Sequence, residues 1–247
     1  MIKRRYIYIA ILFASVLQGC NGAFDGLYDE ALSDEEQQNG FQSAEDATRF
    51  TIRLDARSYE HWHYINLHNR TVETLPIATT LTGEWDGRSQ WTYYNVHGSV
   101  YTEQRSVKVD TQRDAADWDL AIHHFDVKTN GGTALETGYS SLDDLPATSD
   151  AFKEADFTPD EWRTNQCIVD LTNMMSYNVW YTSSMVNTVL SRWVSMDFSS
   201  PPPVYSASQR VYLLRMKDGT CAALRLVDYM SDRGTKGFLT IDVKYPY

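Results

Sequence analysis

The sequence predicts an all-β protein, a single antiparallel β domain with one short helix. Aromatic residues make up 13% of the chain, with 7 Trp and 16 Tyr, and these residue types are enriched on half-buried pleated surfaces. Residues 238–245 alternate apolar and polar side chains, which is the period of a strand with one buried face. Several more short β-rich runs are separated by Asn, Gly and Asp, with few long helical patterns between them.

The first residues have the features of an export signal. The basic residues Lys3–Arg5 precede an apolar run, Tyr6–Leu17, that is too short to cross a bilayer as a helix. The run ends in Leu17-Gln18-Gly19-Cys20, which resembles the lipobox of bacterial lipoproteins. The resemblance implies a signal peptide over residues 1–19 and a lipid on the Cys20 thiol, so that the protein meets the membrane through its lipid anchor alone. The alternative is a soluble secreted protein in which Cys20 is incidental.

An acidic tether is expected over residues 20–47. This stretch holds eight Asp and Glu residues, and the first basic residue after it is Arg49. Such a segment stays solvated, which leaves residues 48–247 as the folded domain. The tether also resembles the surface-export signals of Bacteroidetes lipoproteins, which implies an outer-membrane, cell-surface location. A formal charge of -11 makes nucleic acid an unfavourable partner.

The strands are expected in chain order. Asp218-Gly219 between two apolar runs is typical of a tight hairpin turn, so the runs that flank it should pair antiparallel. The expected strands lie within residues 59–67, 91–96, 101–109, 118–127, 211–216, 221–229 and 238–245.

Two further elements are expected between these strands. Thr158-Pro159-Asp160-Glu161 has a capping threonine, a proline at the first helical position and a glutamate three residues after the cap, which predicts the start of the short helix. Pro201–Pro203 predicts an extended connector.

Cys167 and Cys221 remain once Cys20 is assigned to lipid. An exported chain meets an oxidising compartment, where a disulfide between them could form. The alternative is a pair of buried free thiols that pack as small apolar side chains.

No enzymatic motif stands out. The sequence has no phosphate loop, no dinucleotide fingerprint, no Gly-x-Ser-x-Gly elbow and no His-Glu-x-x-His, so we expect a protein that is not an enzyme. His61 and His63 alternate with Trp62 and Tyr64, which predicts a solvated histidine face opposite an aromatic core face rather than a metal site. His123-His124 is expected to include a hydrogen-bonded structural histidine.

One block of sequence resembles a known family. Trp118-Asp119-Leu120-Ala121-Ile122-His123, followed by Asp126-Val127-Lys128-Thr129-Asn130-Gly131-Gly132, resembles the signature of the HmuY family, haem-binding lipoproteins of Bacteroidetes. Similar segments follow in the family's order up to Gly237-Phe238. The resemblance implies an all-β domain that holds haem between two finger-like loops. It also implies that haem is taken from host haemoproteins or the surroundings and delivered to a TonB-dependent outer-membrane receptor.

Family members clamp the iron between two axial side chains, and this implies ligands here. The loop after the short helix holds Met174 and Met175, which are the candidate thioether ligands, with core filling as the alternative. The other ligand is expected after Gly132, but no His or Met lies between Asn130 and Asn173. Tyr139 is the candidate there, because tyrosinate ligates ferric haem.

Two further expectations concern ligand recognition. The haem propionates need cationic or hydroxyl partners, and Lys128, Arg88 and Arg105 are candidates. The alternative function is a surface glycan-binding lipoprotein that stacks exposed aromatic side chains on sugar rings, without haem.

Overall fold

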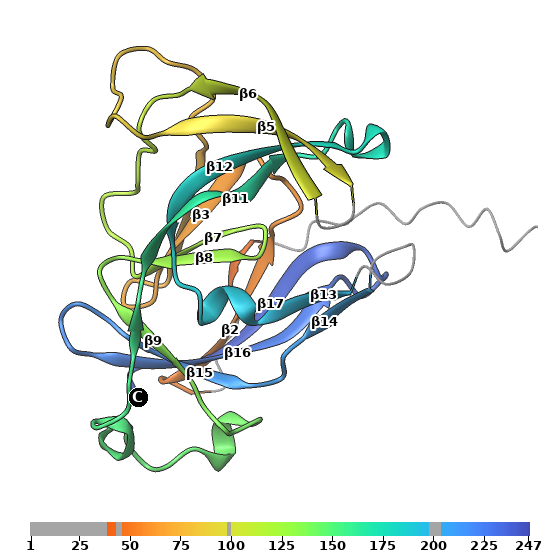
Figure 1. The fold of residues 1–247 in the computed structure, drawn as a ribbon. Helices are drawn as coiled ribbons and strands as arrows, with labels where there is room; N and C mark the ends of the chain where they lie inside the picture. The colour runs from red at the N-terminus through yellow and green to blue at the C-terminus, as the bar shows by residue number, and fades with distance from the viewer. Residues whose placement is uncertain (1–38, 43–45, 98–99, 198–203) are drawn as a thin grey trace, which may run out of the picture. The chain divides into compact units, whose positions relative to one another are not determined.

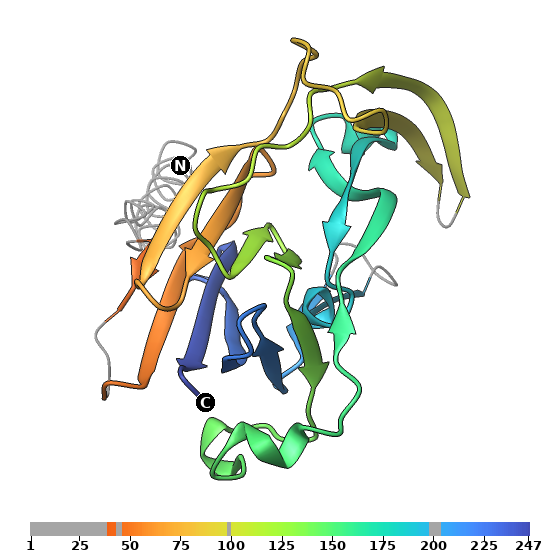
Figure 2. The same cartoon turned by 90° about the vertical axis from the view of Figure 1, so that its left-hand side faces the viewer.

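The computed structural model describes residues 39–42, 46–97, 100–197 and 204–247. Every strand pair in this part of the chain is antiparallel. Figures 1 and 2 show the strands grouped into sheets, with only short turns of helix between them. The all-β prediction is confirmed.

The largest sheet has seven strands in the order β1-β2-β17-β16-β15-β9-β10. Its β15–β16 hairpin turns at Gly219, whose φ of 88° is accessible to glycine without strain. This confirms the predicted pairing around Asp218-Gly219. The strands are β1 (Gly40–Phe41), β2 (Arg49–Asp55), β9 (Thr133–Glu136), β10 (Thr158–Pro159), β15 (Val211–Arg215), β16 (Cys221–Met230) and β17 (Lys236–Lys244).

A four-stranded sheet packs on one face of this seven-stranded sheet. Its order is β4-β3-β7-β8, and Ile65, Leu120 and Ile122 on one of its faces join the large core. Trp62, Tyr64 and Ala121 on its other face join a second, aromatic core. Both faces of this sheet are therefore covered. The strands are β3 (His61–Asn66), β4 (Thr71–Pro76), β7 (Leu120–His123) and β8 (Asp126–Thr129).

The remaining strands form two smaller sheets. The order β11-β12-β5-β6 makes a second four-stranded sheet, and a lone hairpin joins β13 to β14. Trp91 of β5 and Trp180 of β12 pack on the aromatic core. The strands are β5 (Gln90–His97), β6 (Val100–Lys108), β11 (Glu161–Asp170), β12 (Asn178–Val186), β13 (Val194–Asp197) and β14 (Val204–Ala207).

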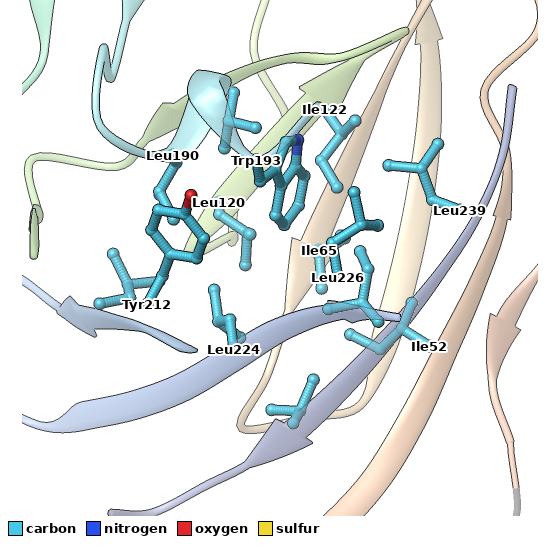
Figure 3. Packing of buried hydrophobic residues seen from close by; sticks show 14 of the residues in the cluster. Ile52, Ile65, Leu120, Ile122, Leu190, Trp193, Tyr212, Leu224, Leu226 and Leu239 are labelled. Atoms are coloured by element: carbon cyan, nitrogen blue, oxygen red, sulfur yellow. The ribbon is translucent and has the colours of Figure 1, made fainter. Parts of the chain in front are cut away.

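The large core is centred on Trp193, which is fully buried. Trp193 follows η4 (Leu190–Arg192), a short 3-10 turn. Figure 3 shows its indole beside Ile122, in the same cluster as Leu224 and Leu226 of the seven-stranded sheet. This side chain fills the space between the two packed sheets.

The predicted helix at Thr158 is wrong. Thr158 and Pro159 form β10 and pair with Thr133 and Ala134, and β11 begins directly afterwards. The Asp160 carboxylate accepts hydrogen bonds from the Thr129 backbone N–H at 2.6 Å and from the Thr129 hydroxyl at 2.9 Å. The residues that would cap a helix therefore pair with and hydrogen-bond to neighbouring strands, because long-range strand pairing outweighs the local helix propensity. The described helices are all short 3-10 turns.

Three other expectations are corrected. Residues 118–127 form two strands, β7 and β8, because His124 takes a left-handed turn with φ 56°. Within the expected tether, Gly40 and Phe41 form β1 and pair with β2, so these two residues are not a solvated coil. Cys167 and Cys221 lie in different sheets and form no disulfide. Both are buried free thiols, which was the alternative to the bridge. The signal peptide, Cys20, most of the tether and Pro201–Pro203 lie outside the described residues.

The family-like block holds the sheets together. The Asp119 carboxylate accepts the Leu67 backbone N–H at 2.7 Å, and the Asn130 side chain donates to the Trp118 carbonyl at 2.8 Å. A Cβ at Gly132 would lie 2.8 Å from the Arg215 carbonyl oxygen of β15. The block therefore fixes β7 and β8 against their neighbours, and only glycine fits where the chain crosses β15.

Candidate ligand site at three hairpin ends

Three hairpins end on the same side of the molecule in Figure 1. The β5–β6 hairpin ends at His97 and Val100, and the β13–β14 hairpin ends at Asp197 and Val204. The β11–β12 hairpin ends in η3 (Met174–Ser176), a single 3-10 turn. We call these segments the hairpin ends.

Exposed apolar side chains concentrate at the hairpin ends. Ten large hydrophobic residues are exposed in the described part of the chain. Six of the ten lie here, namely Val100, Tyr101, Met174, Met175, Tyr177 and Val204. A cluster of this kind on a soluble domain marks a surface that binds an apolar ligand or partner.

The methionine loop is anchored through its backbone and not through its methionine side chains. Tyr177 ends η3 in a left-handed conformation with φ 60°, and its N–H donates to the Met174 carbonyl at 2.8 Å. The Tyr177 carbonyl accepts the Val96 N–H of β5 at 2.7 Å. The side chains of Met174 and Met175 are 45% and 94% exposed. Core filling, the alternative role for both residues, is excluded by this exposure.

The imidazole of His97, which was not selected as a candidate from the sequence, lies beside this loop. The ring of His97 packs on the ring of Tyr177 with centroids 4.5 Å apart and planes 32° apart. His97 is exposed, like Met175. Its only sequence signal is its place at the end of a predicted strand, which does not say which other loop lies next to it.

Aromatic side chains of β5, β6 and β12 pack together next to the hairpin ends. The rings of Tyr94, Tyr101 and Tyr181 lie 5.8–6.1 Å apart, edge to face. Burial raises the pKa of Tyr181, so its hydroxyl stays neutral. Further along the same sheet, the Arg105 guanidinium covers the Trp180 ring at 4.9 Å. These contacts join β5, β6 and β12 into one platform.

The structure does not bring Tyr139 to the methionines. Tyr139 follows β9 and packs in the cluster on the outer face of the seven-stranded sheet, beside Phe152. Its backbone carbonyl accepts the Val211 N–H at 2.9 Å. Tyr139 therefore packs against the seven-stranded sheet, whereas Met174 and Met175 lie in the turn between β11 and β12 of another sheet.

The two other propionate candidates line a cavity away from the methionine loop. This cavity, of about 460 Å³, contains Arg88, Trp118, Lys128, Asn130 and Trp162. The Lys128 ammonium is buried, contacts Asp114 Oδ1 at 2.6 Å and lies 4.4 Å from the Trp62 ring centroid. Burial lowers the pKa of Lys128, and Asp114 opposes that shift. Lys128 already has its counter-ion, which favours a structural role over propionate binding.

The predicted solvated histidine face is wrong for His63. The seven-stranded sheet covers this side of β3, so His63 is buried, and its Nδ1 lies 3.0 Å from the Thr74 hydroxyl. Burial lowers the pKa of His63 to about 4. The described residues contain no group of three or more His, Cys, Asp or Glu side chains placed to hold a metal ion.

His124 is a structural histidine, as predicted for the His123-His124 pair. Its Nδ1 lies 2.8 Å from the Ala56 carbonyl, and its Nε2 lies 2.9 Å and 2.7 Å from the hydroxyls of Tyr59 and Tyr229. This arrangement suits a neutral ring that donates through Nδ1 and accepts a phenol hydrogen at Nε2. Burial lowers the pKa of His124 to about 4.

The neutral His124 predicts a pH-dependent stability. The unfolded ring binds a proton near pH 6.5 and the folded ring near pH 4, so the unfolded state holds more protons between these values. The contribution is therefore full well above pH 6.5 and is lost as the pH falls through 6.5 toward 4. For His124 alone we expect a loss of about 1 kcal/mol between roughly pH 7.5 and pH 6. Urea unfolding at the two pH values measures this loss.

A matched pair of variants isolates the contribution of His124. His124→Asn keeps a residue that tolerates the left-handed backbone, and the stability change between the two pH values should shrink by about 1 kcal/mol. His68→Asn changes an exposed histidine and should leave the change as in the wild type. Equal pH dependence in the wild type and His124→Asn would contradict a neutral His124.

Comparison with known proteins identifies the family. The fold is an all-antiparallel β domain whose hairpins end in exposed apolar side chains. The family model described as HmuY protein matches residues 88–243, and the chain belongs to the HmuY family. The proteins of this family are binding proteins. A comparison with curated proteins gives no match.

Solved structures agree with this assignment. A protein from Bacteroides vulgatus, described as a candidate HmuY-like haem-binding protein, is 33% identical with a TM-score of 0.65, over 85% of this chain and 99% of its own. A candidate lipoprotein from Bacteroides fragilis is 38% identical with a TM-score of 0.63, over 85% and 96%. The apo form of an HmuY analogue from Tannerella forsythia is 23% identical with a TM-score of 0.61, over 82% and 98%, and shares the fold.

The part of the chain that the structure describes contains no helix long and apolar enough to cross a membrane.

Proposed function

We propose that this chain binds haem at the hairpin ends, with Met174 or Met175 as a thioether ligand to the iron. The observation that carries the proposal is the exposure of both methionines within the main cluster of exposed apolar side chains. A thioether is an established axial ligand of haem iron. The apolar faces of a porphyrin ring would cover Val100, Tyr101, Tyr177 and Val204, which otherwise face water.

The residues present fit such a ligand. The methionine loop hydrogen-bonds to β5 through its backbone, so its position is set while its thioethers stay free. Arg105 is the candidate for a propionate partner, since it shares the β5–β6 hairpin with the hairpin ends. The relative from Bacteroides vulgatus, at 33% identity, is itself described as a candidate haem-binding protein.

We further propose that the protein is a lipoprotein anchored at Cys20, exposed at the cell surface, which passes haem to a TonB-dependent outer-membrane receptor. The lipobox-like Leu17–Cys20 supports the anchor, and the Bacteroides fragilis relative is described as a candidate lipoprotein. A protein that carries haem as cargo must release it to another protein. A site at the hairpin ends leaves the bound haem accessible to that second protein.

A hemin titration of the purified chain, followed by absorbance in the oxidised and reduced states, tests haem binding. We expect a saturable Soret shift with one hemin per chain, because the hairpin ends form one cluster. Serum albumin serves as the positive control for hemin quality. A linear, unsaturated increase, identical to free hemin with added inert protein, would overturn the proposal.

A further inference from the structure

We propose that His97 supplies the second axial ligand to the haem iron, on the side opposite the thioether of Met174 or Met175. This inference rests on the proposed function and adds to it a residue from a different hairpin. Iron in haem offers two axial positions, and a neutral imidazole fills one of them in many haem proteins. His97 lies 77 residues before Met174 in the chain, so no local sequence pattern connects the two residues.

The two hairpins are held in register next to each other. Val96, which directly precedes His97, donates its N–H to the Tyr177 carbonyl at 2.7 Å. The Asn95 side chain donates to the Asn178 side chain at 3.1 Å. β5 and β12 therefore meet at their ends, and His97 lies at the same edge as η3.

Tyr177 connects the imidazole to the methionine loop. Its ring lies 4.5 Å from the His97 ring, and its N–H closes the turn on the Met174 carbonyl. The ring contact restricts His97 on one face and leaves the ring edge, which carries the nitrogens, without a hydrogen-bond partner among the described residues. An imidazole in this state is free to donate a nitrogen lone pair to iron.

The other described histidines are occupied or lie elsewhere. His123 and His124 are buried and contact the carbonyls of Tyr59 and Ala56. His63 is buried against Thr74, and His61 Nδ1 lies 3.3 Å from the Ser58 hydroxyl. His68 follows β3 at its turn to β4. Among the described histidines, His97 alone has a ring contact with the segment from Met174 to Tyr177.

The test compares His97→Ala with His68→Ala, which removes another exposed imidazole. Hemin is titrated into the full chain, and the ferric complex is examined by absorbance and electron paramagnetic resonance. We expect the wild type and His68→Ala to give the low-spin signal of a six-coordinate iron. His97→Ala should give a high-spin signal and bind hemin about tenfold more weakly, or worse. Added imidazole should return the low-spin signal to His97→Ala, because the free base occupies the vacated position.

The outcomes separate this inference from the proposed function. If the wild type binds hemin saturably and His97→Ala keeps the same spin state and affinity, haem binding stands and His97 is not a ligand. If the wild type shows no saturable binding, both proposals are overturned. Far-ultraviolet circular dichroism of each variant checks folding, which should be unchanged since His97 is exposed.

Discussion

Replacing Met174 and Met175 together by alanine is expected to weaken hemin binding at least about tenfold, which corresponds to about 1.4 kcal/mol. The double change removes both thioethers at the hairpin ends and the apolar surface that a porphyrin would cover. Folding should be unaffected, because the turn is closed by backbone hydrogen bonds from Tyr177 and Val96. Hemin titration followed by the Soret band measures the change. The near-infrared charge-transfer band of thioether-ligated ferric haem should also disappear.

Met185→Ala is the matched control for the double variant. Met185 is also partly exposed, but it lies in β12 and lines the cavity near Lys128 instead of the hairpin ends. Its loss should leave hemin affinity and the charge-transfer band as in the wild type. Equal affinity of the double variant and the wild type would remove this loop as the source of a ligand.

The Tyr139→Phe variant tests whether Tyr139, the other ligand candidate chosen from the sequence, binds the haem iron. Tyr139 packs in the cluster that covers the outer face of the seven-stranded sheet, so the ferric spectrum should not change when its hydroxyl is removed. A spectral shift in this variant would restore tyrosinate as a ligand and contradict the site at the hairpin ends.

Replacing Trp193 by alanine is expected to destabilise the fold by about 3–5 kcal/mol. Trp193 is fully buried in the core that the seven-stranded sheet shares with the sheet of β3 and β7. The loss combines the transfer of a large aromatic side chain with the cavity left behind. Denaturant unfolding monitored by circular dichroism gives the difference in free energy of unfolding.

Trp85→Ala provides the comparison for Trp193. Trp85 is exposed, and its indole N–H donates to the Ser89 carbonyl at 2.8 Å. Its removal should cost less than the removal of Trp193, because Trp85 is 38% exposed and lies outside the large core. Similar losses in the two variants would contradict the central role of Trp193 in the core.

Strands were predictable where only one face of the sheet is buried, because apolar and polar residues then alternate along the strand. In β17, Leu239, Ile241 and Val243 are buried as their alternation predicted, because the strand has one core face. β3 was harder to predict. His63 lies in a strand that is covered on both faces, so alternation with Trp62 and Tyr64 could not identify a solvated side. Alternation identifies a strand and its two faces, but it does not count the layers that pack on it.

A local helix motif gave the wrong prediction where the same residues pair with a distant strand. The Thr158–Glu161 segment has the residues of a helix start, and in isolation they favour that state. In the fold, Thr158 and Pro159 complete the edge of the seven-stranded sheet, and the Asp160 carboxylate accepts two hydrogen bonds from Thr129. Pairing partners 24 and 26 residues away cannot be found from a four-residue motif.

The sequence by itself determined the all-β class, the β15–β16 hairpin and the family, because short-range alternation, turn residues and a contiguous block carry that information. It also selected Met174 and Met175 as candidates for ligation. Only the tertiary structure decided that these side chains are exposed, that His97 lies beside them and that Tyr139 does not. Those facts depend on which hairpins pair, and strand pairing joins residues far apart in the chain through contacts that no local pattern records.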